Sequence, residues 1–177
     1  MAKHWIAFFS QSGKEIADLS EKLGRWPTRI VTNERPEHLR TVDKRIEKQG
    51  YFTLPNKPTV DDYNVVLEDN ALVTLHGWLR IIPPEICERY KIYNGHPGLV
   101  NLYSGLKGYN SQERIVGKQA EYRFIGSVVH KVTAQVDEGE VLVYSKVSNN
   151  VRTVEQAYKV LRETSFKAWI EFFNTVL

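Results

Sequence analysis

The chain has 177 residues and a formal net charge of +3, and 42% of its residues are hydrophobic while 25% are charged. These values are ordinary for a globular protein, and so small a charge does not imply nucleic-acid binding. No segment approaches the roughly 20 apolar residues that span a bilayer. We therefore expect one domain over residues 1–177, in the cytoplasm, with no membrane or nucleic-acid partner.

Strands are predicted wherever short apolar runs occur in the first half of the chain. These runs cover residues 5–10, 28–33, 51–54 and 71–77. Helices are predicted between them. Ser12 and Glu15 fit a capping box before a helix with apolar residues at helical spacing. Pro36 is placed to begin a second helix through residue 49, and Thr59 is placed to cap a third through about residue 68.

The second half of the chain continues this alternation. A helix is predicted over 83–90, a strand over 91–94, a helix over 106–116, and two strands over 123–133 and 140–147 with a tight loop between them. Thr153 is expected to cap a long C-terminal helix, with Gln156 at its third position. Its apolar face is predicted to contain Val154, Ala157, Tyr158, Leu161, Ser165, Ala168, Trp169, Phe172 and Val176.

Strand–helix alternation with continuous apolar strands predicts an α/β fold. The expected architecture is Rossmann-like, with a mostly parallel twisted sheet and helices on both faces. Ligands of such sheets bind beyond the carboxyl ends of the strands. This rule predicts that three loops, "SQSGKE", "HGWLR" and "NGHPG", lie on one rim.

The stretch "IYNGHPGL" places an amide and an imidazole two residues apart. In an extended segment the side chains of Asn94 and His96 point the same way, so together they could hold an oxygen that gains negative charge. From the residues alone a turn is the favoured interpretation, because Asn, Gly and Pro mark turns in many proteins. Asp137, between two predicted strands, is likewise by itself an ordinary turn residue. Beside His96, however, its carboxylate would raise the pKa of the imidazole.

Other groups carry weaker signals. "SQSGKE" contains one glycine, so helix capping is favoured over phosphate binding there. "GWLRIIPPEI" could line a pocket for a flat ligand or belong to the core. The histidines show no metal-ligand spacing, and His130 in a β-branched strand is by default a core histidine. Cys87 is alone, so no intrachain disulfide and no metal site are predicted.

Several motifs agree in order and spacing with one family. They are Asn94–Pro97 (Asn-x-His-Pro), Val136–Gly139 (apolar-Asp-x-Gly), His130 seven positions before Asp137, Leu79–Ile81, and Ser10–Gly13. On these motifs the chain resembles the folate-dependent formyltransferases, with the glycinamide ribonucleotide transformylase group nearest in length. The resemblance covers nearly the whole chain, implies the formyltransferase fold, and reverses the preference for a turn at "NGHPG".

The resemblance implies a reaction and roles for these residues. The donor would be 10-formyltetrahydrofolate and the acceptor a small-molecule amine, with Asn94, His96 and Asp137 as catalytic residues and no metal. Folate would be held by Leu79, Arg80, Ile81 and Ile82 together with Thr133, Ala134, Gln135 and Val136. The acceptor would contact Ser12, Gly13, Lys14, Glu15 and His130. A homodimer is the assembly to test.

The chain also departs from the family pattern. Gly95 replaces a common apolar residue, which predicts a looser loop, and Asn101 stands where a proline is frequent. The family's Gly-Ser-Asn, which receives the acceptor's phosphate, here reads Gly13-Lys14-Glu15, and an anion at Glu15 disfavours a phosphate. The chain ends where methionyl-tRNA enzymes carry a second domain, which argues against a tRNA substrate.

Two alternatives stay open. The first is a sugar-nucleotide N-formyltransferase, since "YSGLKGYN" (residues 103–110) looks like a stretch of that group. The second is a non-catalytic folate-binding protein of the same fold. Release of tetrahydrofolate with a panel of amines separates the three interpretations.

Overall fold

The computed structural model describes residues 4–34 and 41–177. The described residues up to Asn94 form one compact unit, and those from Gly95 to Leu177 form a second. The division falls within strand β5 (Ile92–His96). No helix in the described ranges has the length and apolar character that crossing a membrane requires.

The first unit contains a parallel sheet. Its strands are β1 (Trp5–Phe8), β2 (Arg29–Asn33), β3 (Phe52–Leu54), β4 (Leu72–Leu75) and the start of β5, in the spatial order β3-β2-β1-β4-β5. Each neighbouring pair is parallel. Every residue of β1 and β4 is buried, as expected for strands covered on both faces. The predicted α/β class with a mostly parallel sheet is confirmed.

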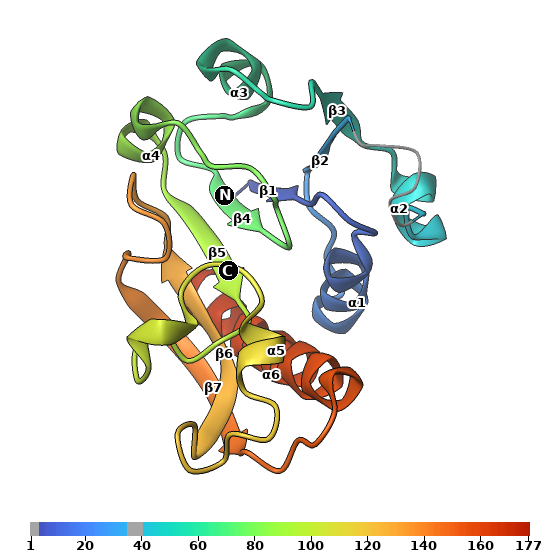
Figure 1. Cartoon of the computed structure of the whole chain (residues 1–177). Coiled ribbons are helices and arrows are strands. Elements are labelled where there is room, and N and C mark those ends of the chain that lie inside the picture. The colour runs from blue at the N-terminus through green and yellow to red at the C-terminus, as the bar shows by residue number, and fades with distance from the viewer. Residues whose placement is uncertain (1–3, 35–40) are drawn as a thin grey trace. The chain divides into compact units, whose positions relative to one another are not determined.

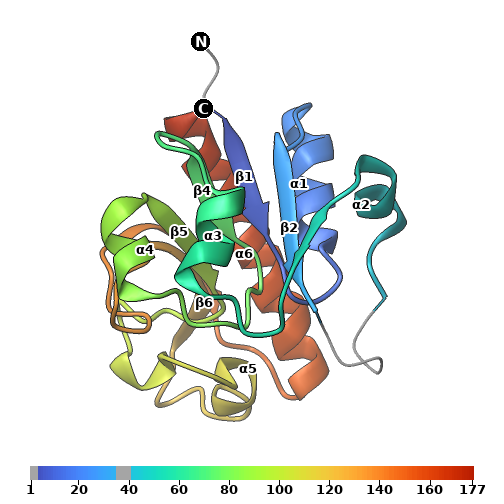
Figure 2. The ribbon, with the colours of Figure 1, turned by 90° about the horizontal axis from the view of Figure 1, so that it is seen from above.

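Four helices flank this sheet. They are α1 (Lys14–Leu23), α2 (Lys44–Gln49), α3 (Val60–Val66) and α4 (Pro84–Arg89). Figures 1 and 2 show α1 and α2 on one side of the sheet and α3 and α4 on the other. Thr59 caps α3 as predicted, in a capping box with Asp62. The predicted start at Pro36 lies outside the described residues, and Asp43 is the N-cap of α2.

The start of α1 differs from its prediction. Gly13 is the N-cap residue, in the left-handed region at φ 71°, and no side chain caps the helix. The Ser12 hydroxyl accepts only from the Lys14 N–H, at 3.3 Å, and Glu15 turns to His76 instead of reaching back to the cap. The predicted Ser12–Glu15 capping box is therefore wrong, because an ion-pair partner far along the chain holds the Glu15 carboxylate.

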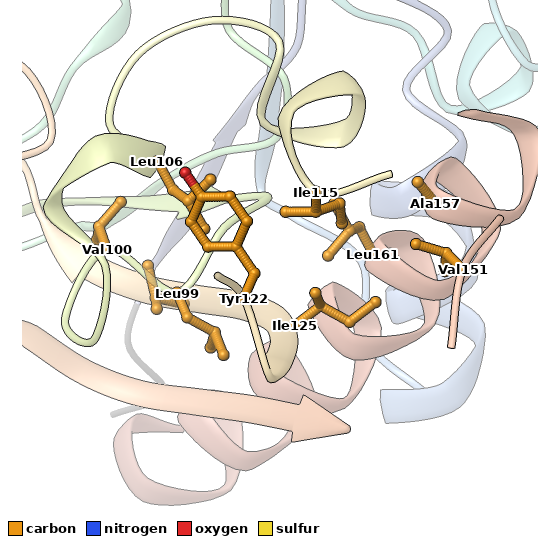
Figure 3. Packing of buried hydrophobic residues seen from close by; sticks show 10 residues of the cluster. Leu99, Val100, Leu106, Ile115, Tyr122, Ile125, Val151, Ala157 and Leu161 are labelled. Atoms are coloured by element: carbon orange, nitrogen blue, oxygen red, sulfur yellow. The ribbon is translucent and has the colours of Figure 1, made fainter. Parts of the chain in front are cut away.

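The second unit is built on an antiparallel hairpin. Strands β6 (Phe124–Lys131) and β7 (Val141–Ser148) pair as predicted, and α6 (Val154–Val176) packs on both. Figure 3 shows a hydrophobic cluster that joins α6 and β6 to the segment before β6. Its buried members are Leu99, Val100, Leu106, Ile115, Tyr122, Ile125, Val128, Val151, Ala157 and Leu161.

Two helical predictions in this unit need correction. The helix expected over 106–116 is reduced to a 3₁₀ turn, η1 (Ser104–Leu106), and a short helix, α5 (Ser111–Arg114), because Gly108 and Asn110 adopt positive φ between them. In α6 Thr153 caps the helix as expected. Val154 and Tyr158, however, are exposed, while Phe173 is buried. The buried face therefore begins at Ala157 rather than at Val154, and it includes Phe173, which the prediction left out.

Candidate active site

Strand β5 carries Asn94 and His96. The strand extends through His96, so the turn at "NGHPG" begins only at Pro97. Asn94 lies opposite Leu75, the last residue of β4, at the carboxyl edge of the first unit's sheet. Because side chains alternate along a strand, residues 94 and 96 present their side chains to the same face. This is the relation that the spacing predicted.

The imidazole of His96 is held at both ring nitrogens within the second unit. Nε2 lies 2.8 Å from the carbonyl oxygen of Leu106. A carbonyl oxygen can only accept, so Nε2 carries the proton. Nδ1 lies 3.4 Å from Oδ2 of Asp137. The neutral ring therefore turns a lone pair toward a carboxylate, and the protonated ring would turn an N–H toward it.

Asp137 lies between two histidines. Its Oδ1 is 3.4 Å from Nε2 of His130, and its Oδ2 accepts from the Gly108 N–H at 2.9 Å. His130 Nδ1 donates to the carbonyl of Lys131 at 3.0 Å. The His96, His130 and Asp137 side chains are only 7%, 3% and 7% exposed. The structure thus brings three predicted site residues into one buried cluster.

The hairpin loop gives Asp137 its place. Asp137 has φ 55°, a left-handed conformation that aspartate tolerates better than most residues. A Cβ at Gly139 would overlap the carbonyl oxygen of Lys131, so only glycine fits there. The Asp-x-Gly motif therefore has a local cause, since it allows the loop to fold back tightly onto the end of β6.

The pKa of His96 has several causes that oppose one another. Burial lowers the pKa of His96 below its usual value, while the Asp137 carboxylate and the bond to Leu106 act in the raising direction. The prediction that His96 has a raised pKa is therefore wrong in its net direction, although Asp137 acts in the predicted sense. For Asp137, burial acts to raise the pKa, but the contacts with His130, His96 and Gly108 outweigh it and leave the pKa low.

Gly95 packs tightly between the two polar residues of β5. A Cβ at Gly95 would lie 2.6 Å from Nε1 and 3.0 Å from Cε2 of Trp169 on α6. The Trp169 side chain is fully buried and contacts the rings of Phe172 and Phe173. The expectation that Gly95 loosens the loop is wrong, because an indole ring fills the space that a side chain would occupy.

We predict that Gly95→Ala lowers both stability and activity. The added methyl group must displace Trp169 or β5, and such overpacking costs about 1–3 kcal/mol. Trp169→Phe, which shortens the opposing ring system, should restore part of the loss when combined with Gly95→Ala. Urea unfolding of the two single variants and the double variant measures this coupling. Additive losses in the double variant would show that the two residues do not compete for the same space.

Two of the loops predicted on the carboxyl rim of the sheet meet in the first unit. The Ser10 N–H donates to the carbonyl of Gly77 at 3.2 Å, and the Leu79 N–H donates to the Ser10 hydroxyl at 3.0 Å. That hydroxyl donates in turn to Asn33. The "SQSGKE" and "HGWLR" loops thus lie together, as the sheet rule predicted.

The segments expected to hold folate expose apolar side chains. Ile81 is 73% exposed in the first unit, and Val136 is 54% exposed in the second. Ile82 is buried, whereas the partly exposed side chain of Arg80 donates from its guanidinium to the backbone and side-chain oxygens of Asn56. In the second segment the Thr133 hydroxyl donates to the carbonyl of Gln135.

Sequence reasoning gave no role to His76, which is the partner of Glu15. Nδ1 of His76 lies 2.8 Å from Oε1 of Glu15, and Nε2 lies 2.9 Å from the Thr74 hydroxyl. That hydroxyl accepts from the Trp5 indole N–H at 2.8 Å. The His76 side chain is fully buried and that of Glu15 is 29% exposed. Residues 15 and 76 are too far apart in the chain for any sequence spacing to show the pair.

Residues 28–172 match the model of the formyl transferase family. The match covers more than half of the chain, so the chain belongs to the formyl transferase family. A phosphoribosylglycinamide formyltransferase of Haemophilus influenzae is 33% identical over 100 residues, which are 50% of this chain and 45% of the relative. Across the curated relatives that it matches, the aligned part spans between 37% and 45% of their length.

Solved structures share the fold. The phosphoribosylglycinamide formyltransferase of Campylobacter jejuni is 21% identical, with a TM-score of 0.74 and 98% of each chain covered. A sugar N-formyltransferase from a Shewanella species is 16% identical, with a TM-score of 0.68, and the match covers 93% of this chain and 65% of that one. At these identities the similarity concerns the fold.

Proposed function

We propose that the protein transfers a formyl group from 10-formyltetrahydrofolate to the amine of a small acceptor. The observation that carries the proposal is the buried His96–Asp137–His130 cluster, with Asn94 two positions before His96, in a member of the formyl transferase family. We further propose that the two units act as one catalytic domain.

The geometry suggests how these residues act. When the acceptor nitrogen bonds to the formyl carbon, the formyl oxygen gains negative charge. Asn94 would donate to that oxygen from its amide. The His96 Nε2–H, now bonded to the Leu106 carbonyl, would exchange this acceptor for the charged oxygen, because hydrogen bonds to ionised acceptors are the stronger ones. The bond between the formyl carbon and the donor nitrogen then breaks, and the proton that the acceptor amine loses ends on that departing nitrogen. Asp137 would stabilise the positive charge that the His96 ring takes on while it passes this proton.

The donor supplies an activated formyl group, and this chain's residues would bind it. We propose that backbone groups of Leu79 to Ile82 bind the pterin, and we make the same proposal for backbone groups of Thr133 to Val136. Ile81 and Val136 each expose an apolar side chain. We also propose that the protein forms a homodimer, which light scattering of the purified protein tests, and that it lies in the cytoplasm, which cell fractionation tests.

The acceptor is proposed to be one whose anionic group, if it has one, lies away from α1. Glycinamide ribonucleotide carries a phosphate, and the relatives named above are phosphoribosylglycinamide formyltransferases. Here, however, the first turn of α1 carries Glu15, whose carboxylate is fixed by His76. A fixed anion at this turn opposes the favourable field that a helix N-terminus offers to a phosphate.

We predict that the wild-type protein uses glycinamide ribonucleotide poorly and that Glu15→Asn improves it. Removing the charge should raise kcat/KM about 10-fold, which corresponds to about 1.4 kcal/mol. Steady-state kinetics with this acceptor provide the measurement. Glu155→Gln, which changes a first-turn acid of α6, is the matched control and should leave the value unchanged. Efficient wild-type turnover that Glu15→Asn does not improve would contradict this proposal and favour the ribonucleotide as the acceptor.

The reaction itself is tested by release of tetrahydrofolate. The protein is incubated with 10-formyltetrahydrofolate and a panel of amines that includes glycinamide ribonucleotide and an aminosugar nucleotide. Turnover with the aminosugar nucleotide alone would support the sugar N-formyltransferase alternative. Folate binding without turnover on any amine would support a non-catalytic binding protein and overturn the proposed enzyme.

A further inference from the structure

Two backbone groups of one short segment hold the two members of the His96–Asp137 pair. The carbonyl of Leu106 accepts from His96 Nε2–H at 2.8 Å, and the N–H of Gly108 donates to Asp137 Oδ2 at 2.9 Å. The segment is a 3₁₀ turn of three residues followed by Lys107 and a glycine at φ 81°. So short a piece of irregular backbone does not fix its own orientation, since glycine adds conformational freedom.

The guanidinium of Arg114 holds this segment from outside. Its Nη1 donates to the carbonyl of Gly105 at 2.7 Å and to the carbonyl of Lys107 at 3.0 Å. Arg114 is the last residue of α5, and its side chain reaches the carbonyls on both sides of Leu106. The peptide units before and after the Leu106–Lys107 unit are therefore both fixed at their oxygen atoms.

Peptide planarity carries this restraint to Asp137. The Lys107 carbonyl and the Gly108 N–H are the two ends of one peptide unit, which is rigid and trans. When Arg114 holds the oxygen end, the N–H end points in a fixed direction, toward Asp137 Oδ2. A cation on the carbonyl also polarises the unit and strengthens its N–H as a donor.

Ser111, at the start of α5, acts on the same segment. Its buried hydroxyl donates to the Leu106 carbonyl at 2.9 Å and lies 3.3 Å from His96 Nε2. Helix α5 therefore presents one side chain to the Leu106 oxygen and another to the oxygens on either side of it.

We propose that Arg114 is a positioning residue for the His96–Asp137 pair. It orients the Leu106 carbonyl and the Gly108 N–H, and through them it fixes which nitrogen of His96 carries the proton and where the Asp137 carboxylate lies. Its effect on catalysis rests on the function proposed above, whereas its effect on the geometry of the pair does not.

The geometric arm is tested by NMR on ¹⁵N-labelled protein without ligands. In Arg114→Met, we expect the Gly108 amide proton to move to higher field, as its bond to Asp137 lengthens, and the His96 ring nitrogens to move away from the pure Nε2–H pattern. Arg114→Lys should recover part of both shifts, because its ammonium can still donate to a carbonyl. Arg162→Met, on an exposed position of α6, is the control and should change neither signal.

The proposal is overturned if, in folded Arg114→Met, the Gly108 and His96 signals change no more than they do in the Arg162→Met control. If Arg114→Met does not fold, Arg114→Lys is judged by the same two signals, with smaller changes expected. In the kinetic test, we expect Arg114→Met to lower kcat on the order of 10-fold and to leave the KM for the formyl donor unchanged. A 1 Å misplacement of reacting groups can cost roughly 100-fold in rate, so a fall of this size fits a small change in geometry. A raised KM with unchanged kcat would contradict it. A protein that transfers no formyl group refutes the proposed function but leaves the NMR result decisive.

Discussion

His96→Ala is expected to lose roughly 100- to 1000-fold of kcat, the usual cost of removing one donor to an oxyanion. The substitution removes the Nε2–H and the partner of Asp137 together. Binding of folate should survive, since the segments proposed to hold the pterin do not include residue 96. The measurements are kcat with a good acceptor and folate affinity by calorimetry.

Asn94→Ala should give a loss of the same order, because the two side chains are proposed to share one oxygen. His4→Ala is the matched control. The His4 side chain is 63% exposed and pairs with Glu68, which has no part in the proposed mechanism. Its kcat should stay close to the wild-type value. The unfolding midpoint of each variant shows whether it is folded. A folded Asn94 or His96 variant with a kcat close to the wild-type value would contradict the proposed mechanism.

Asp137→Asn is expected to lower activity by about 100-fold or more, in the range typical of general acid–base catalysis. The amide is nearly the same size as the carboxylate and can still accept from the Gly108 N–H, so the fold should persist. The charge that opposes the effect of burial on His96 is lost. The pKa of His96, already lowered, should therefore fall further, and imidazolium should become harder to form during turnover.

The experiment tests whether the pKa of His96 falls when the Asp137 carboxylate is replaced by an amide. Titration of the His96 ring by NMR should give a lower pKa in Asp137→Asn than in the wild type. Asp137 itself is ionised throughout the neutral range, because its own pKa lies below the usual value of 3.8. Glu138→Gln is the control, since this neighbouring carboxylate pairs with Lys107 at 2.7 Å, whereas the carboxylate that lies beside His96 is that of Asp137. An unchanged pKa of His96 in the Asp137 variant would remove Asp137 from the mechanism.

The amino-acid sequence by itself determined the features that depend on neighbouring residues. Apolar runs of strand length predicted β1, β2, β3 and β4, and Thr59 and Thr153 cap their helices as predicted, because strand period and capping are local properties. The two-residue spacing of Asn94 and His96 already placed both side chains on one face of β5. The Asp-x-Gly motif placed a carboxylate in a tight loop.

Only the tertiary structure decided how the polar groups of the site are held. Glu15 and His76, Gly95 and Trp169, and His96 and the Leu106 carbonyl meet across many residues, and no period in the sequence relates them. The capping box at Ser12 failed for this reason, since the distant histidine took the carboxylate. The net direction of the His96 pKa likewise depends on burial, which is a property of the packed molecule: the carboxylate of Asp137 was visible in the sequence, whereas the desolvation that outweighs it arises only when the chain is folded.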